Sequence, residues 1–331
     1  MFPIYRNFLC KIFFLCGLCF VCSFALEKPE PATDSLPQIR TEWEHGLSFS
    51  AVVLSHRALR NSKSLHDWPF FAFAMPVSWT SSLKLGMDVR RVLSIKGNAG
   101  GSLTLFGAGV KAGVKVELLH LLEVGVETNA GSAINYGDMS TFMGVFDPEK
   151  KDYSQDIFMT EFSYGIRYEV GFSLPLMVVL PKSKWTKIIL RPTASLSYSA
   201  YTGASDGEVW KAGSANMVNG YNYRYGGSFI YMLPFRHFPM AMVSTEVRGF
   251  LHKSDFDECY RAYDPEFKMV SVTPMLSIKL DEKWIGMLMA PISRDRRYRN
   301  YRYESGQEIL QERVGSEWTL NAVIFVMTRK F

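Results

Sequence analysis

Residues 106–117 read "FGAGVKAGVKVE", and small or apolar side chains take every second position along the stretch. One set of alternate positions holds Ala108, Val110, Ala112, Val114 and Val116, and the other holds Lys111, Gly113, Lys115 and Glu117. Successive side chains of a β-strand point to opposite faces of the sheet. The stretch therefore predicts a strand with one apolar face and one polar face.

The same period of two recurs along most of the chain, and helix-period stretches of useful length are absent, so we expect an all-β fold. Twelve strands are expected, near residues 45–54, 69–79, 82–94, 102–116, 120–128, 157–180, 187–201, 221–233, 239–251, 267–280, 284–292 and 318–331. Pro192 and Pro274 fall inside two of them, where each removes a backbone donor from the ladder. A bulge or a shifted strand boundary is expected at each proline.

The expected connections alternate between two lengths. The long set is 55–68, 129–156, 202–220, 252–266 and 293–317, and the short set is Ser81, the residues around Leu119, 181–186, 234–238 and 281–283. The connection 95–101 ("IKGNAGG") is shorter than the rest of its set. Short turns at one end and long loops at the other are typical of a transmembrane up-and-down antiparallel β-barrel, whereas a Greek-key sandwich would mix the two.

Charged residues within the expected strands avoid the apolar positions, except Arg91 and Lys268, which lie near strand ends. A charge facing lipid near the middle of a bilayer would cost roughly 2–4 kcal/mol, so a barrel has to direct such residues inward. The residues expected to face the lumen are Lys84, Asp88, Arg90, Lys111, Lys115, Glu161, Arg167, Glu169, Arg191, Arg224, Glu246 and Arg248. This set contains both signs of charge and predicts weak ion selectivity.

Tryptophans lie at or just outside the ends of expected strands. These are Trp68, Trp79, Trp185, Trp284 and Trp318. Amphipathic rings collect at the two membrane–water boundaries of a barrel, so we expect these five to form interfacial belts. The alternative is that they close the ends of a soluble β-core.

The N-terminus predicts export. Arg6 and Lys11 precede an apolar run from Ile12 to Val21, and small residues follow at Ser23 and Ala25. This order matches a secretory signal peptide over 1–25; an uncleaved anchor helix or a lipid-modified cysteine is the alternative. Residues 26–43 read as a flexible periplasmic lead-in, and residues 44–331 as the barrel. Only Cys259 would remain after cleavage, so the mature protein cannot depend on an intramolecular disulfide.

The C-terminal stretch "WTLNAVIFVMTRKF" (residues 318–331) ends on an aromatic residue, with Val323, Phe325 and Met327 alternating before Phe331. With this ending the chain resembles the outer-membrane β-barrel proteins of double-membraned bacteria, porin-like and without an assigned subfamily. The resemblance implies residence among outer-membrane lipids and recognition of the last strand by the barrel-assembly machinery. Arg329 departs from the family pattern, which has an apolar or aromatic residue at this position, and we expect it to snorkel at the membrane boundary.

No catalytic constellation stands out, and we do not expect an enzyme. The stretch "HKSDFDEC" places His252 close to Ser254, Asp255 and Asp257. Outer-membrane phospholipases carry a His-x-Ser pair, but theirs continues into Asn-Gly, which is absent here. Metal-binding and phosphate-cradling motifs are also absent, so neither a metal nor a cofactor is expected.

The stretch "SRDRRYRNYRYES" (residues 293–305) interleaves arginines with tyrosines. On an exported barrel it is either a surface loop that contacts anionic lipid heads or polymers, or a solvated extension of a strand. The net charge of only +5 gives no reason to expect a nucleic-acid partner.

The leading hypothesis is a narrow passive channel for small solutes, because twelve strands lie between side-chain-filled barrels and wide pores. The alternatives are a closed surface barrel that acts as an adhesin or structural protein through its long loops, an outer-membrane hydrolase and a soluble periplasmic β-protein.

Overall fold

A computed structural model gives the fold. It describes residues 39–54, 77–89, 92–104, 107–119, 121–133, 143–154, 159–178, 183, 187–212, 215–281, 283–299 and 307–330. The expected signal peptide, Arg90, Trp68, Trp185 and Phe331 lie outside these residues. No helix in the described ranges has both the length and the apolar composition needed to cross a membrane.

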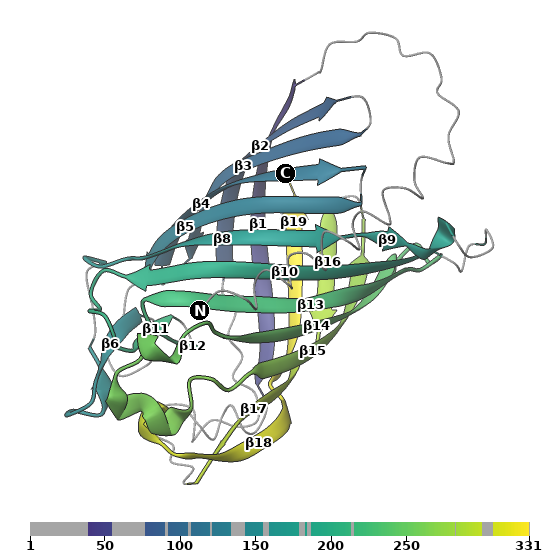
Figure 1. Cartoon of the computed structure of the whole chain (residues 1–331). Coiled ribbons are helices and arrows are strands. Elements are labelled where there is room, and N and C mark those ends of the chain that lie inside the picture. The colour runs from purple at the N-terminus through teal and green to yellow at the C-terminus, as the bar shows by residue number, and fades with distance from the viewer. Residues whose placement is uncertain are drawn as a thin grey trace, which may run out of the picture. The chain divides into compact units, whose positions relative to one another are not determined.

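Antiparallel strands form one large sheet (Figure 1). Its members are β1 (Ile39–Leu54), β2 (Val77–Val89), β3 (Leu93–Thr104), β4 (Gly107–Leu118), β5 (Leu122–Ala133), β8 (Ser163–Phe172), β9 (Leu174–Pro175), β10 (Ile188–Tyr201), β13 (Gly220–Met232), β14 (Met240–Phe250), β15 (Met269–Lys279), β16 (Trp284–Met289), β17 (Ile292–Tyr298), β18 (Arg313–Leu320) and β19 (Ala322–Lys330). Consecutive strands along the chain are neighbours in the sheet, which is the up-and-down order expected from the sequence.

The pairings of these strands run in a ring. β14 pairs with both β13 and β15, β15 with β16, β16 with β19, and β19 with β1. β16 and β17 follow one path interrupted at Ala290 and Pro291, and β18 and β19 follow one path interrupted at Asn321. With β9 as a short side branch on β10, the ring has twelve strand paths. The all-β class and the twelve strands expected from the sequence are confirmed.

Two strand boundaries in the first third of the chain were predicted wrongly. Ser81 was expected to be a turn but lies inside β2, opposite Gly101. The stretch 95–101 was expected to be a connection but lies inside β3 and pairs with both β2 and β4. At the long-loop end, the unusually short connection is therefore not 95–101 but the one that joins Thr104 to Gly107. The first strand also begins earlier than expected, at Ile39.

The two strand prolines lie beside interruptions in a neighbouring strand, as their missing donors require. The residues of β10 from Thr193 onward pair with β8, whereas Ile189 and Leu190 pair with β9. Pro192 lies between these two groups, at the break between β8 and β9. Pro274 in β15 faces the interruption between β16 and β17, where its carbonyl accepts a hydrogen bond from the Ala290 amide at 3.2 Å. A proline in a ring with no free edge is thus accommodated at a local break.

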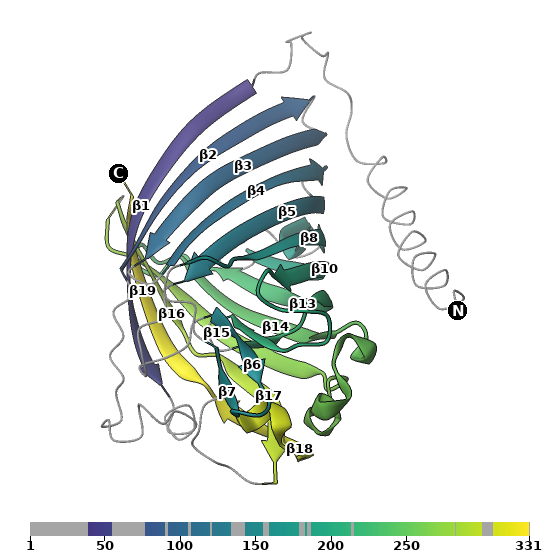
Figure 2. The same cartoon turned by 90° about the vertical axis from the view of Figure 1, so that its left-hand side faces the viewer.

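Further short elements connect the ring strands at the long-loop end (Figures 1 and 2). They are β6 (Met143–Asp147), β7 (Asp152–Tyr153), β11 (Trp210–Ala212), β12 (Ala215–Met217) and the 3-10 helices η4 (Lys253–Asp255), η5 (Glu258–Tyr263) and η6 (Gln307–Leu310), whereas η3 (Leu176–Val178) lies at the short-turn end. Most of the buried apolar residues belong to these connections. The main hydrophobic core of the described chain therefore lies at one end of the ring.

Candidate functional site: the inner face of the ring

The register of the strands determines which side chains share the inner face. Directly opposite residues of paired strands lie on the same side of a sheet. Lys115 pairs with Gly125, Gly125 with Glu169, and Glu169 with Ser195. Ser195 pairs with Arg224, which in turn pairs with Arg248. Charged positions therefore follow one face across six adjacent strands.

The opposite face is apolar and exposed. Its most exposed large side chains on the strands include Leu103, Val110, Val114, Val124, Val126, Tyr164, Tyr168, Tyr225, Phe229, Val243, Leu288 and Trp318. All of them except Leu288, whose short strand contains no charged residue, alternate with the charged positions of their own strands. An exposed apolar band around a ring whose charges point the other way is the arrangement of a transmembrane barrel, with lipid outside.

Most residues predicted to face the lumen share this inner face by register. These are Lys84, Asp88, Lys111, Lys115, Arg167, Glu169, Arg191, Arg224, Glu246 and Arg248. Glu161 precedes β8 and lies at its long-loop end, where its main-chain carbonyl accepts a hydrogen bond from the Ser132 hydroxyl at 2.6 Å.

Sequence reasoning missed several charges on the same face. They are Arg40, Glu42, Glu44, Lys96, Glu123 and Glu127. Glu117 also lies on this face, as its place on the polar side of its expected strand indicated, but it was not among the residues expected in the lumen. Lys96 was missed because its strand was taken for a turn, and Arg40 and Glu42 because they were placed in the lead-in. Glu123 and Glu127 occupy the positions that alternate with the apolar residues Val124 and Val126. This alternation alone could have identified both glutamates as inner-face charges.

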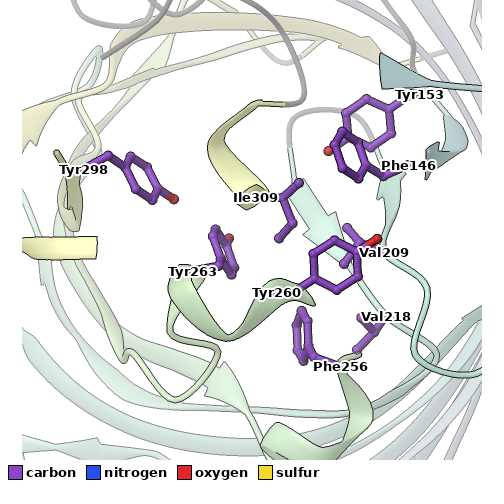
Figure 3. Packing of buried hydrophobic residues seen from close by; sticks show 9 residues of the cluster. All are labelled: Phe146, Tyr153, Val209, Val218, Phe256, Tyr260, Tyr263, Tyr298 and Ile309. Atoms are coloured by element: carbon purple, nitrogen blue, oxygen red, sulfur yellow. The ribbon is translucent and has the colours of Figure 1, made fainter. Parts of the chain in front are cut away.

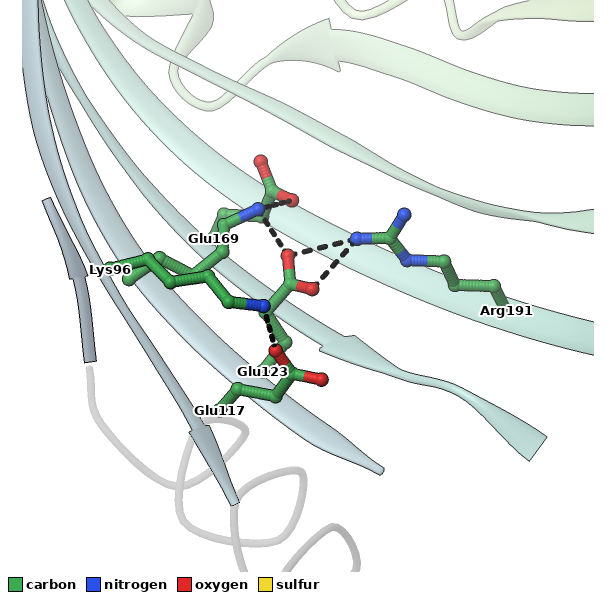
Figure 4. A network of polar contacts seen from close by, with 6 residues as sticks. Lys96, Glu117, Glu123, Glu169 and Arg191 are labelled. Carbon is green, nitrogen blue, oxygen red and sulfur yellow. Dashed lines mark hydrogen bonds and ion pairs between the residues drawn. The ribbon is translucent and has the colours of Figure 1, made fainter. Parts of the chain in front are cut away.

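Glu123 lies at the centre of an ion-pair network (Figure 4). Arg191 donates from Nη2 to both carboxylate oxygens of Glu123, at 2.9 and 2.8 Å. The Lys115 ammonium also contacts Glu123, and its nitrogen lies 3.9 Å from the carboxylate of Glu169. Beside this network Lys96 pairs with Glu117. Three strands are thus linked through one carboxylate on the inner face.

Further ion pairs continue along the inner face. Lys84 pairs with Glu44 at 2.7 Å, while Arg167 with Glu127 and Arg224 with Glu246 are each 4.0 Å apart. Among the described inner-face residues, Arg40, Lys111 and Arg248 have no acidic partner. Glu42 and Asp88, on the same face, have no basic partner among those residues. The face therefore carries unpaired charges of both signs.

Open space borders these charges. One hollow of about 430 Å³ is lined by residues that include Lys84, Lys96, Lys115 and Arg167, and a second of about 150 Å³ by Arg167, Glu169, Arg224 and Glu246. The two hollows share Arg167 and Glu169. The side chains of Lys84 and Lys96 are 50% and 55% exposed although they point inward. Water can therefore reach the inner face, and the ring is not filled by its own side chains.

The connections at the long-loop end share one aromatic core, which we call the cap (Figure 3). Its buried members are Phe146, Tyr153, Val209, Val218, Phe256, Tyr260, Tyr263, Tyr298 and Ile309. Phe146 packs edge-on against Tyr153 with ring centroids 5.2 Å apart, and Tyr263 stacks on Tyr298 at 6.3 Å. The members come from four separate connections or strand ends, so the long loops are joined to one another.

Close contacts join the connections of the cap to one another and to the ring. Gly207 and Phe256 form a parallel bridge, and the Asp257 amide donates to the Gly207 carbonyl at 3.2 Å. A Cβ atom on Gly220, at the start of β13, would meet Asp255 Oδ2 at 2.5 Å. Gly220 and Arg224 are four residues apart in β13 and therefore face the same, inner side of the sheet. Because Asp255 lies where a Gly220 side chain would be, Asp255 lies against the inner face. The cap therefore reaches into the mouth of the ring.

The guanidinium groups of two arginines in the run 293–305 contact other segments of the protein. The Arg296 guanidinium lies 3.9 Å from the centroid of the Tyr263 ring and donates to the Asp264 carbonyl at 3.1 Å. Arg294 lies 5.5 Å from the Phe267 ring. These contacts connect β17 to the end of η5. Ligand binding by the run stays a prediction, carried by its more exposed members.

The polar stretch around His252 does not assemble into a catalytic site. His252 and Ser254 are exposed, and no hydrogen bond joins their side chains in the part of the chain that the structure describes. Asp257 instead lies beside Gly207 and Asp255 beside Gly220. No group of three or more His, Cys, Asp or Glu side chains among the described residues is arranged to hold a metal ion.

Aromatic residues mark both ends of the strands. Trp284 is the first residue of β16, Trp79 lies near the start of β2, and Trp318 lies in β18 with 56% of its surface exposed. Trp43 in β1 is 63% exposed and was missed because it fell in the predicted lead-in. The Arg329 guanidinium lies 5.6 Å from the ring of Trp284, which is its register partner. The interfacial role of these residues stays a prediction.

The fold and the two faces place the chain in the class of transmembrane β-barrels. No family model matches the sequence, and no curated protein matches it. Among solved structures it is similar to the NanC porin, with 9% identity and a TM-score of 0.37 over 87% of this chain and 100% of that one. It is also similar to an outer membrane channel from Pseudomonas putida F1, with 10% identity and a TM-score of 0.39 over 92% and 100%.

The translocator domain of the autotransporter NalP from Neisseria meningitidis is a third similar structure, with 7% identity and a TM-score of 0.35 over 98% of each chain. At these identities and scores the similarity does not extend to function.

Proposed function

We propose that the protein is a narrow passive channel for small solutes in the outer membrane of a double-membraned bacterium. The observation that carries the proposal is the exposure of charged side chains inside the ring, with Lys84 and Lys96 half exposed beside a hollow of about 430 Å³. Charges buried in a filled interior would have been costly, whereas charges along a water-filled lumen keep their hydration.

The balance of charge supports weak ion selectivity. Most inner cations have an acidic partner, and the cations named on the inner face outnumber the anions only slightly. The cap supports a low conductance, because it reaches into the mouth of the ring at the long-loop end and narrows the entrance to the lumen.

Single-channel recording of the refolded mature chain in a planar bilayer tests the proposal. We expect small, discrete current steps in KCl with a slight preference for chloride. A protein that inserts and shows heat-modifiable gel mobility, yet gives no steps above the bilayer background, would contradict the channel. If osmotic lysis and carbonate washing released the native protein from membranes, the outer-membrane location would be wrong.

A further inference from the structure

The larger hollow of the inner face has a floor made partly of glycine. Gly86, Gly113 and Gly125 line it, and register places all three on the inner face. A Cβ atom on Gly113 would meet Asn98 Oδ1 at 2.9 Å, and one on Gly125 would meet Lys115 Cε at 3.5 Å. At Gly86, nothing among the described residues beyond its chain neighbours lies within 4 Å of the Cβ position. The open part of this hollow of about 430 Å³ therefore lies above Gly86.

β1, β2 and β3 lie side by side (Figure 2), and their charged side chains surround Gly86. Arg40 in β1 and Lys96 in β3 lie directly opposite Gly86, one on each side. Lys84, the next inner-face residue of β2, lies opposite Glu42. All four charged residues line the same hollow as Gly86. One small solute above Gly86 can therefore contact groups of both signs.

Two of these four charges are free to bind a solute. The two lysines already contact carboxylates that do not line the hollow, those of Glu44 and Glu117. Arg40 and Glu42 have no oppositely charged partner among the described residues, and both are exposed. Water solvates such charges until a solute with matching charges replaces it. The free groups belong to residues two apart on one face of β1, or about 7 Å at the rise of a strand.

This separation selects the length of the solute. An extended dipeptide places its amine nitrogen about 6 Å from its carboxylate carbon, whereas the two groups of a free amino acid are only about 2.5 Å apart. A dipeptide can thus offer its carboxylate to Arg40 and its ammonium group to Glu42 at the same time. A guanidinium binds a carboxylate through two parallel hydrogen bonds, and hydrogen bonds between charged groups are stronger than neutral ones.

We propose that this hollow binds short zwitterionic peptides, dipeptides above all, on their way through the lumen. Arg40 holds the carboxylate, Glu42 holds the ammonium group, and the peptide backbone lies over Gly86. The proposal rests on the proposed channel function and names a solute class for it. Solutes that carry only one of the two charges are bound less tightly, because they satisfy only one of the two free groups.

Ligand-detected NMR of the refolded full-length mature protein tests the proposal without requiring ion current. Three probes share one backbone and differ at their ends: glycylglycine carries both charges, N-acetylglycylglycine only the carboxylate, and glycylglycinamide only the ammonium group. Glycylglycine should bind in a saturable manner and about tenfold more tightly than either of the others, the factor expected for one charged hydrogen bond. Glycine should also bind more weakly, because it cannot span the two groups.

Two variants assign each end of the peptide to its residue. Glu42→Gln should remove the preference for glycylglycine over N-acetylglycylglycine and keep the preference over glycylglycinamide. Arg40→Gln should do the reverse. Arg248→Gln is the matched control and should leave all three affinities unchanged. Arg248 is also an inner-face cation without an acidic partner among the described residues, but it does not line this hollow.

Filling the hollow gives a test that does not depend on charge. Gly86→Val places a side chain in the open space and should abolish the saturable binding of glycylglycine. Gly101→Val is the matched control, because Gly101 lies opposite Val110 on the lipid face of β3. The nearest atom to a Cβ there is the Gly109 carbonyl oxygen at 3.7 Å, an ordinary contact. Heat-modifiable gel mobility checks that each variant has folded.

Three results would overturn the proposal: no saturable binding of glycylglycine, equal affinity of the unchanged protein for N-acetylglycylglycine, or undiminished binding by the Gly86→Val variant. The channel itself is judged separately by current steps in KCl. Binding without steps would refute the channel and keep the binding site, whereas steps without glycylglycine binding would refute the solute class alone.

Discussion

At the scale of single residues, Glu123 is the most connected charge of the inner face. Its carboxylate accepts two hydrogen bonds from Arg191 and contacts Lys115, and its side chain is only 14% exposed. A carboxylate shared by two cations balances charges that would otherwise repel each other across β4, β5 and β10. Loss of one partner from a part-buried network costs more than the pair itself contributes.

Glu123→Gln should lower the free energy of unfolding by about 1–3 kcal/mol, the range for removing a charged hydrogen-bond partner. It should also raise the chloride preference of the channel, because Lys115 and Arg191 lose their shared anion. Urea unfolding in detergent and the reversal potential in a KCl gradient measure the two effects. Glu258→Gln is the matched control, since Glu258 pairs with Arg261 at an exposed site where ion pairs contribute little. Equal stability of the two variants would contradict the role of the network.

The thiol of Cys259 in the cap offers a residue-scale test by pH. Partial burial of the thiol, and next the nearby Asp257 carboxylate, raise the pKa of Cys259 above its ordinary value. A raised pKa means less thiolate at a given pH, so the midpoint of its alkylation by iodoacetamide should lie above that of free cysteine. Asp257→Asn should lower this midpoint, and full denaturation should return it to the ordinary value. A midpoint at or below that of free cysteine in the folded protein would contradict the prediction.

At the scale of elements, the cap depends on a close approach between two connections. Gly207 has a φ of +89°, and a Cβ atom there would collide with the Asp257 side chain. Only glycine satisfies both constraints without strain. The bridge from Gly207 to Phe256 is thus possible because this position has no side chain.

Gly207→Ala should loosen the cap while leaving the ring intact. Backbone strain of about 1–3 kcal/mol would favour the open cap and speed tryptic cleavage at Lys253 or Arg261 by about tenfold or more. Gly315→Ala is the matched control, because nothing lies within 4 Å of a Cβ at Gly315. Limited proteolysis read by mass spectrometry measures the effect. Equal cleavage rates for the two variants would show that the bridge does not hold the cap.

At the scale of the whole molecule, the two faces of the ring predict opposite responses to a charge. Val243 and Ser244 are neighbours in β14, and register places Val243 toward lipid and Ser244 toward the lumen. Val243→Lys should destabilise the barrel by about 2–4 kcal/mol, whereas Ser244→Lys should cost little and should increase chloride selectivity. Unfolding in lipid vesicles and reversal potentials measure the pair. If Ser244→Lys were the more damaging change, the assignment of the faces would be inverted.

The sequence predicted the ring well because alternation reports which face each residue occupies. The charges of β4, β8, β10, β13 and β14 share one face by register, as their parity in the sequence indicated, and their position in an open lumen stays a prediction. Lys96 was missed for a physical reason. The glycines around it were taken as turn formers, but a Cβ at Gly100 would meet the Ser81 carbonyl at 2.8 Å. This glycine therefore permits close packing of β3 against β2, which a single sequence does not distinguish from a turn.

The cap and the row of methionines that includes Met275 and Met287 could not be predicted from the sequence for a different reason. Each is made by segments far apart in the chain, and local periodicity carries no information about which segments meet. Tyr298 and Phe146, for example, contribute to one buried cluster although each lies in a stretch without regular alternation. Met275 and Met287 become one surface only through the register of β15 and β16.

The pairing of β1 with β19 also affects how fast the ring can form. Residues Gly46 to Leu54 find their partners in Ala322 to Lys330, at the far end of the chain. Contacts between distant segments form slowly, because the entropy of closing the intervening loop is lost before the contact compensates for it. Closure must therefore wait until the last strand has been synthesised and exported. Until then both edge strands present unpaired backbone groups that are prone to aggregation, so the unfinished chain needs protection during its passage to the membrane.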